Sequence, residues 1–193
     1  MTLRIAATAL VLTGIALAGE TGNPNVTGLL NTFSTNCGVP GDRYRKAQWV
    51  FAERNESGKW RKMSMGALKA CEACSHTAYV WKGHQGRLLV EFNEVDESGD
   101  WYQYVMYCFQ SNGTLEQAIS DLNTAWGWAV VQEFTVQGDK VVAHAVEYRN
   151  LRTWEKTSKP KDPIDADEFY GDRKPRMYSR AGSLPFYSLL ERH

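Results

Sequence analysis

The chain has 193 residues, and its 22 lysines and arginines are balanced by 22 aspartates and glutamates. A nucleic-acid-binding protein shows a basic excess on one face, so the balanced charge and the lack of a basic stripe argue against that class. The length suits one domain that buries about 70% of its unfolded surface.

Residues 1–18, MTLRIAATALVLTGIALA, predict a signal peptide. A single basic residue, Arg4, precedes an apolar run that ends in Ala-Leu-Ala, the small-x-small pattern that signal peptidase cleaves. The run is shorter than the ~20 apolar residues of a membrane-spanning helix, and no other segment approaches that length. We therefore expect a secreted or periplasmic protein in which residues 19–193 form a single β-rich domain with no membrane span.

A ten-residue string occurs twice, as FAERNESGKW at 51–60 and as FNEVDESGDW at 92–101. In both copies an alternating stretch leads into Glu-Ser-Gly, whose glycine can adopt the positive φ of a tight turn. Trp60 and Trp101 would then start the returning strands. The repeat therefore predicts two β-hairpins of the same design.

Alternation of apolar and polar residues predicts strands along most of the chain. The expected strands are 47–54, 59–65, 77–82, 87–95, 101–110, 128–136 and 140–149. One segment shows helical spacing instead, which predicts a helix over 115–126. Its apolar positions are Leu115, Ala118, Ile119, Leu122 and Ala125.

The C-terminal part changes in character after Trp154. Residues 155–176 are polar and contain several prolines, which predicts an extended surface segment and not a folded element. Residues 177–193 regain leucines and aromatic residues, so we expect this tail to dock on the body of the domain.

The strands are numerous and locally connected, so their sheet must cover its edges and one apolar face. The sequence therefore predicts a mainly β fold, an antiparallel meander forming a barrel or half-barrel with one packed helix; an α+β fold is the alternative. The run from Gly113 to Arg149, with LNTAWGW and the start of the string EYRNL, together with Tyr178 and LPFYSLL near the end, resembles secreted bacterial proteins of unassigned function. The resemblance implies export and no particular activity.

Four cysteines follow the signal peptide: Cys37, Cys71, Cys74 and Cys108. An even number in an oxidising compartment favours two disulfides, for which three pairings are open; the first candidate has a bridge from the 71–74 loop to Cys108 and another through Cys37. The alternative is that the C-x-x-C string is a redox couple or a metal knuckle. No helix N-terminus is predicted at Cys71 and no second C-x-x-C completes a zinc set, so we favour structural disulfides.

Glu133 and His144 are the best candidates for a catalytic acid/base pair. A two-residue turn at 138–139 would place them on opposite strands, where the carboxylate could orient the imidazole. No nucleophile in a recognisable elbow accompanies them, and charged cross-strand pairs are common on solvated sheet faces. The acidic loops at 96–100 and 162–168 lack the spacing of a calcium-binding loop, so we expect no metal site.

Aromatic residues are abundant, with 7 Trp and 9 Tyr. Ring faces bury large areas, while the phenol or indole tip still donates hydrogen bonds, so a cup of such rings could hold a small ligand. A solid core built from the same rings is the alternative. The candidate ligand-binding residues are Trp101, Tyr102, Tyr104, Trp126 and Trp128.

The favoured function is thus a non-catalytic, exported binding module for an apolar, aromatic or carbohydrate ligand, without a cofactor and without a nucleic-acid partner. One alternative is an extracytoplasmic enzyme that uses Glu133 and His144. The other is a structural or protein-contact role in the cell envelope, with residues 155–176 engaging a partner.

Overall fold

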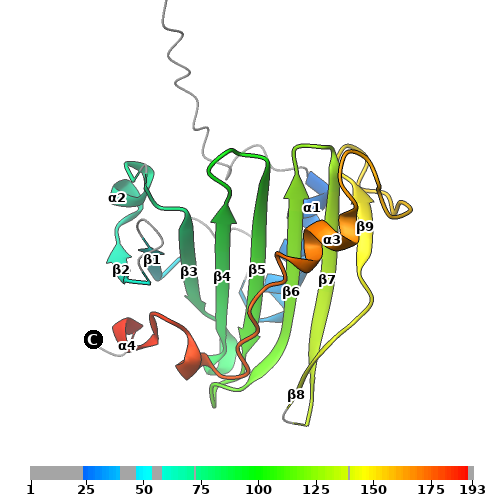
Figure 1. Ribbon diagram of the computed structural model, residues 1–193. Coiled ribbons are helices and arrows are strands. Elements are labelled where there is room, and N and C mark those ends of the chain that lie inside the picture. Colours follow the sequence, from blue (N-terminus) through cyan, green and yellow to red (C-terminus); the bar gives the residue numbers. More distant parts are fainter. Residues whose placement is uncertain (1–23, 40–46, 54–57, 72, 139, 191–193) are drawn as a thin grey trace, which may run out of the picture.

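The computed structural model describes residues 24–39, 47–53, 58–71, 73–138 and 140–190, so the predicted signal peptide lies outside the described residues. Within these ranges nine strands form one antiparallel sheet in the order β2-β1-β3-β4-β5-β6-β7-β8, and β9 pairs with β7 (Figure 1). The strands are β1 Trp49–Glu53, β2 Trp60–Met63, β3 His76–Lys82, β4 Leu88–Val95, β5 Trp101–Phe109, β6 Leu115–Thr124, β7 Trp128–Gln137, β8 Lys140–Ala143 and β9 Glu147–Asn150.

The mainly β prediction is confirmed. The sheet is open, because β2 at one end and β8 at the other do not pair with each other, so the fold is a half-barrel-like meander and not a closed barrel. The described helical elements are α1 Pro24–Asn36, α2 Met65–Lys69, α3 Ala166–Gly171 and α4 Tyr187–Leu190, with 3-10 turns at His84–Gly86 and Ala181–Ser183.

Both copies of the ten-residue repeat form the predicted hairpins. Gly58 and Gly99 have φ values of 67° and 77°, the left-handed conformation that glycine adopts most easily. Trp60 begins β2 and Trp101 begins β5. The pairings are β1 with β2 and β4 with β5, while β3 lies between the two hairpins.

The predicted helix over 115–126 is wrong, because Leu115–Thr124 is strand β6 in the middle of the sheet. β6 pairs with β5 on one side and with β7 on the other, and nearly all of its residues are buried. A strand covered on both faces needs apolar residues at odd and even positions, so the period of two is lost and the spacing resembles that of a helix.

The packed helix is α1, which crosses one face of the sheet (Figure 1). Leu30, Phe33 and Cys37 recur at helical spacing and are buried against Trp81, Met106 and other side chains of this face. We call it the α1 face, and the opposite one the front face.

The two disulfides differ from the expected pairing. Cys37, just after α1, is bonded to Cys108 in β5 with a Cα–Cα distance of 5.7 Å, and Cys71 is bonded to Cys74. The first bridge fastens α1 to the centre of the sheet across 71 residues of sequence. The expected bridge from the 71–74 loop to Cys108 is therefore wrong.

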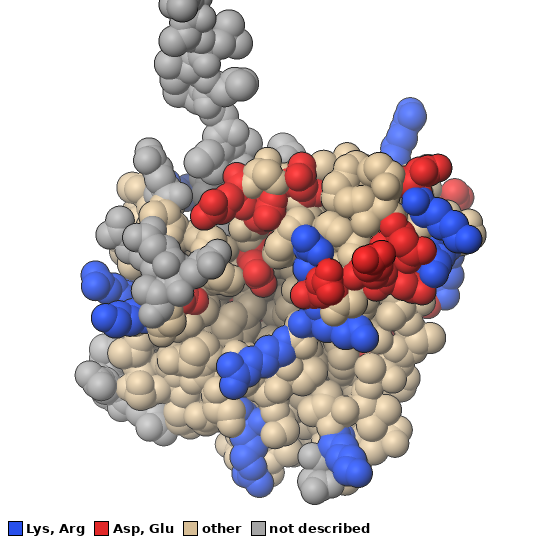
Figure 2. All heavy atoms as spheres, in the orientation of Figure 1, with Lys and Arg blue, Asp and Glu red and all other residues tan. Residues whose placement is uncertain are grey.

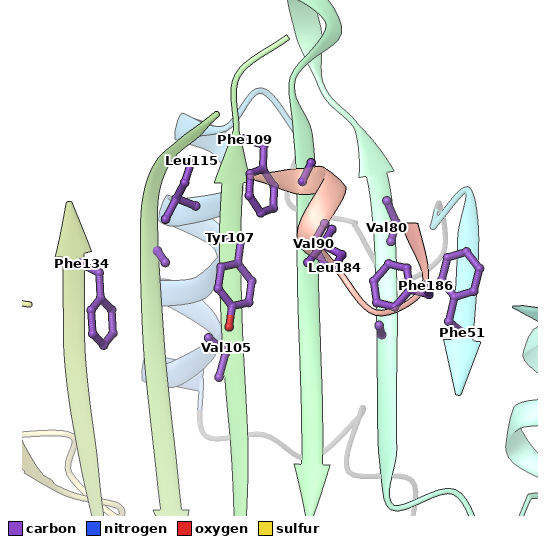
Figure 3. Packing of buried hydrophobic residues seen from close by; sticks show 13 residues of the cluster. Phe51, Val80, Val90, Val105, Tyr107, Phe109, Leu115, Phe134, Leu184 and Phe186 are labelled. Carbon is purple, nitrogen blue, oxygen red and sulfur yellow. The ribbon is translucent and has the colours of Figure 1, made fainter. Parts of the chain in front are cut away.

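The front face is covered by the C-terminal part of the chain. Leu184 and Phe186 are buried against the central strands (Figure 3), and the ring of Phe186 stacks on that of Phe51 with centroids 4.5 Å apart. Stacking removes the facing surfaces of the two rings from water and so adds to the apolar area that is buried on folding.

Residues 155–176, predicted to be extended, contain the short helix α3. The Asp165 side chain caps it by accepting hydrogen bonds from the backbone amides of Asp167 and Glu168. Phe169 and Tyr170 are buried, and the Tyr170 hydroxyl donates a 2.8 Å hydrogen bond to the Gln132 side chain. This part of the segment therefore packs on the sheet and is not an extended surface segment.

Candidate functional site

A hollow of about 420 Å³ opens on the front face between the strands and the C-terminal segment. We call it the aromatic hollow. In Figure 2 a depression lies near the centre of this face, with acidic residues along its upper margin. The described lining residues are Glu53, Gly58, Trp60, His76, Phe92, Glu94, Gln103, Val105, Tyr107, Pro175, Arg176, Tyr178 and Pro185.

His76 lies between two carboxylates at the edge of the aromatic hollow. In the sheet register, Glu53 of β1 and Glu94 of β4 are the two cross-strand partners of His76 in β3. Side chains at paired positions point to the same face of a sheet, so all three project to the front. The Nδ1 atom of His76 is 3.7 Å from Glu53 Oε2, and its Nε2 atom is 3.2 Å from Glu94 Oε1.

The Glu53 carboxylate is held in place by its burial and by the turn of the first hairpin. The Glu53 side chain is only 11% exposed, and its other oxygen accepts a hydrogen bond from the backbone amide of Gly58, at the turn of the first hairpin. Glu94 is more open, at 43%. Of these two carboxylates, that of Glu94 is therefore the more accessible to a ligand.

Three aromatic rings form the floor and one wall of the aromatic hollow. Phe92 lies at the centre, with the ring of Trp60 edge-on at 5.6 Å and the ring of Tyr178 stacked at 5.8 Å. All three are half-buried, so each ring is packed on one side and open in part. Tyr107, beneath them, donates a 2.6 Å hydrogen bond to the backbone oxygen of Arg176.

The polar groups facing the rings come from β5 and the C-terminal segment. Gln103 is buried, and its amide nitrogen donates to Ser120 Oγ at 3.3 Å and to the backbone oxygen of Arg173 at 3.0 Å. The guanidinium of Arg176 lies over the Tyr178 ring, 5.3 Å from its centroid. Side chains fixed in this way present a preformed surface to a ligand.

A second hollow, of about 390 Å³, adjoins the first, because His76 and Glu94 line both. We call it the acidic hollow. Its other lining residues are Ser75, Val95, Asp96, Glu97 and Trp101. The acidic hollow thus places three carboxylates beside one tryptophan ring.

A polar cluster of another kind lies on the α1 face. Asp121 and Asn123 of β6 are completely buried, and the oxygen atoms of Asp121 have no hydrogen-bond partner in the described structure. Burial raises the pKa of Asp121 to about 7, although the Asn123 amide and the charge on Arg149 favour the carboxylate. Tyr104 is paired with Asp121 across the strands, and burial raises the pKa of its phenol as well.

Glu133 and His144 lie in the expected register, since the backbone amide of His144 donates a 2.9 Å hydrogen bond to the backbone carbonyl oxygen of Glu133. Both side chains are exposed, and the imidazole Nε2 atom lies 3.0 Å from the Thr135 hydroxyl. Neither residue lines the aromatic or the acidic hollow. The register is thus the expected one, and a catalytic role for this exposed pair stays a prediction.

The five predicted ligand-binding aromatics do not share one pocket. Tyr102 and Tyr104 point to the α1 face, whereas Trp101, Trp126 and Trp128 lie on the front side. The rings of Trp126 and Trp128 pack edge-on against Phe169 of α3 and form part of a core cluster. Among the five, Trp101 alone lines either of the two hollows described above.

The residues of the aromatic hollow were missed, although the sequence carried a signal for them. Glu53, Trp60, Phe92 and Glu94 all belong to the ten-residue repeat. Its two copies are hairpins on either side of β3, and equivalent side chains of both copies therefore meet around His76.

Neither a metal-binding cluster nor a membrane-spanning helix is present within the described ranges. No group of three or more His, Cys, Asp and Glu side chains there is arranged to hold a metal ion. In the same part of the chain, no helix has the length and apolar character needed to cross a membrane. Comparison with known proteins found no matching family model, no matching curated protein and no matching solved structure.

Proposed function

We propose that the protein is an exported binding module whose aromatic hollow holds a carbohydrate. One observation carries the proposal: the rings of Trp60, Phe92 and Tyr178 line a hollow whose other groups are Glu53, Glu94 and polar side chains. A sugar ring has an apolar C–H face that can stack on an aromatic ring and hydroxyls at its edge that can donate to carboxylates.

The polar lining favours a carbohydrate over a lipid. An acyl chain would exclude water from the half-exposed Glu94 carboxylate without offering it a hydrogen bond, and a polar group desolvated in this way costs about 1–3 kcal/mol. A sugar offers hydroxyls that can donate to that carboxylate. An apolar ligand is therefore the less suitable occupant of this hollow.

Export is part of the proposal and rests on two features. Both cysteine pairs are oxidised, which is typical of proteins from extracytoplasmic compartments. The N-terminal sequence has the charge and apolar pattern of a signal peptide.

The test is a titration of the oxidised protein with cellulose-, xylan- and chitin-derived oligosaccharides, followed by tryptophan fluorescence and calorimetry. Trp60→Ala should weaken binding about tenfold, since it removes a stacking surface. Trp49→Ala is the matched control, because Trp49 is also a half-buried tryptophan of the front face but lies at the other end of β1 from Glu53 and does not line the hollow. If no oligosaccharide binds, or if both variants bind like the wild type, the proposal is wrong.

A further inference from the structure

We propose that the site selects an amino sugar, a carbohydrate that carries a protonated amine, over a neutral sugar of the same backbone. The inference rests on the proposed function and specifies its ligand. It starts from the charges around the two adjoining hollows, which share His76 and Glu94.

The described lining is acidic on the side of the sheet. Glu53, Glu94, Asp96 and Glu97 contribute four carboxylates, and Arg176 contributes a permanent positive charge. A protonated His76 would add one positive charge, which still leaves the lining with a net negative charge. The acidic margin is visible above the depression in Figure 2.

The positive charge of Arg176 lies at the other end of the arrangement. Its guanidinium stacks over Tyr178, whereas Asp96 and Glu97 line the acidic hollow together with Trp101. Arg176 does not line that hollow. A ligand that stacks on the rings of the aromatic hollow and extends past Glu94 therefore reaches the acidic hollow, whose described lining carries three carboxylates. Beside that lining lies Arg173, whose guanidinium is 5.2 Å from the centroid of the Trp101 ring.

An ammonium group is a stronger hydrogen-bond donor to the carboxylates of the acidic hollow than a hydroxyl group is. It donates up to three hydrogen bonds, and those that join it to a carboxylate are shorter and stronger than bonds between neutral groups. The half-exposed Glu94 is the natural first contact, because it lies at the boundary of the two hollows. Electrostatic complementarity of this kind contributes specificity more than raw affinity.

The experiment compares glucosamine oligomers with their N-acetylated counterparts of equal length, in calorimetric titrations near pH 5.5 at low and high salt. The two series share one backbone and differ at the nitrogen, which is a protonated amine in one and a neutral acetamide in the other. We expect the glucosamine oligomer to bind on the order of tenfold more tightly at low salt, and the preference to shrink at high salt.

Glu94→Gln should remove most of the preference, because it should weaken binding of the glucosamine oligomer, which loses a charged contact, more than that of the N-acetylated oligomer, which loses only a hydroxyl contact. Glu133→Gln is the matched control, since Glu133 is an exposed acid on the opposite face, and it should keep the preference. Urea unfolding of each variant verifies that it is folded.

The outcomes separate this inference from the proposed function. If both oligomer series bind equally and Trp60→Ala weakens both, the protein binds carbohydrate without selecting an amine, and only the present inference is overturned. A preference that survives in Glu94→Gln also overturns it. If neither series binds, the proposed function fails and this inference fails with it.

Discussion

Asp121 offers a sharp test of the structure because it is a completely buried carboxyl group in the middle of the sheet. Its oxygens have no hydrogen-bond partner in the described residues, and burial raises its pKa from 3.8 to about 7. Desolvation disfavours the charged form, so the folded state holds a proton that the unfolded chain releases at lower pH.

Proton linkage determines whether Asp121 makes the protein more or less stable as the pH rises. Between about pH 4 and pH 7 the folded state binds more protons at this position, so its contribution to stability decreases as the pH rises. The rise of the pKa from 3.8 to about 7 lowers the free energy of unfolding by ~4 kcal/mol once the pH is well above 7, at about 1.4 kcal/mol for each pKa unit. Of this decrease, about 3 kcal/mol falls between pH 4.5 and pH 8.

Asp121→Asn should abolish this dependence, because an amide of nearly equal size does not ionise. We expect the variant to gain ~3 kcal/mol relative to the wild type when the measurement moves from about pH 4.5 to about pH 8. A constant cost from the buried amide does not affect that difference. The assay is urea unfolding of the oxidised protein at several pH values, monitored by tryptophan fluorescence.

Asp167→Asn is the control, since Asp167 is exposed and its interactions with Lys159 and Tyr148 lower its pKa. The stability that the Asp167 carboxylate contributes is complete above about pH 4 and is lost only as the pH falls through its lowered pKa, so the control should stay parallel to the wild type between about pH 4.5 and pH 8. If the stabilities of Asp121→Asn and the wild type ran parallel across the whole range, Asp121 would not be protonated in the fold and the reasoning would be refuted.

Further predictions concern covalent and aromatic contacts. Replacing Cys37 and Cys108 with serine should lower the free energy of unfolding by about 4 kcal/mol, because the bridge closes a loop of 71 residues, as urea unfolding would show. The same change at Cys71 and Cys74, only 3 residues apart, should cost about 2 kcal/mol, and equal losses for the two pairs would contradict the loop-closure argument. Phe186→Ala should cost about 3–5 kcal/mol in the same assay, since the ring is fully buried on Phe51; a loss below 1 kcal/mol would mean that the tail does not pack as described.

The hairpins could be predicted from sequence because their determinants are local. A positive-φ glycine and a β-rich stretch on each side specify a hairpin within about ten residues, as at Gly58 and Gly99. The segment of β6 lacks such a determinant. Its residues are strand-forming only because β5, β7 and the layers on both faces surround them, and that tertiary context is not visible in a single segment.

Helix α1 illustrates a signal that was present but weak. Its sequence, PNVTGLLNTFSTN, contains Gly, Thr, Asn and Ser, all poorer helix formers than alanine or leucine. Leu30, Phe33 and Cys37 nevertheless recur at helical spacing and carry the packing. Tertiary contacts and the disulfide to Cys108 thus stabilise a helix that would be marginal in isolation.

The ten-residue repeat connects the fold to the proposed site. Phe51 and Phe92 are both cross-strand partners of Ala78, and Glu53 and Glu94 are both partners of His76, so the two copies place equivalent side chains on either side of β3. Because the two strands that flank β3 carry the same repeat in the same register, they place Glu53 and Glu94 on both sides of His76.

The two copies of the repeat differ in where they place Trp60 and Trp101, and this difference makes the two hollows unlike each other. Glu53 is paired directly with Trp60, whereas Glu94 is paired with Gln103, two residues beyond Trp101. The second hairpin therefore extends one residue pair further before it turns, which moves Trp101 away from Phe92 and into the acidic hollow. Gln103 occupies the place beside Glu94 that Trp60 occupies beside Glu53, so one copy supplies an aromatic wall and the other a polar one. A ligand with an apolar ring face and a polar or charged edge matches that asymmetry.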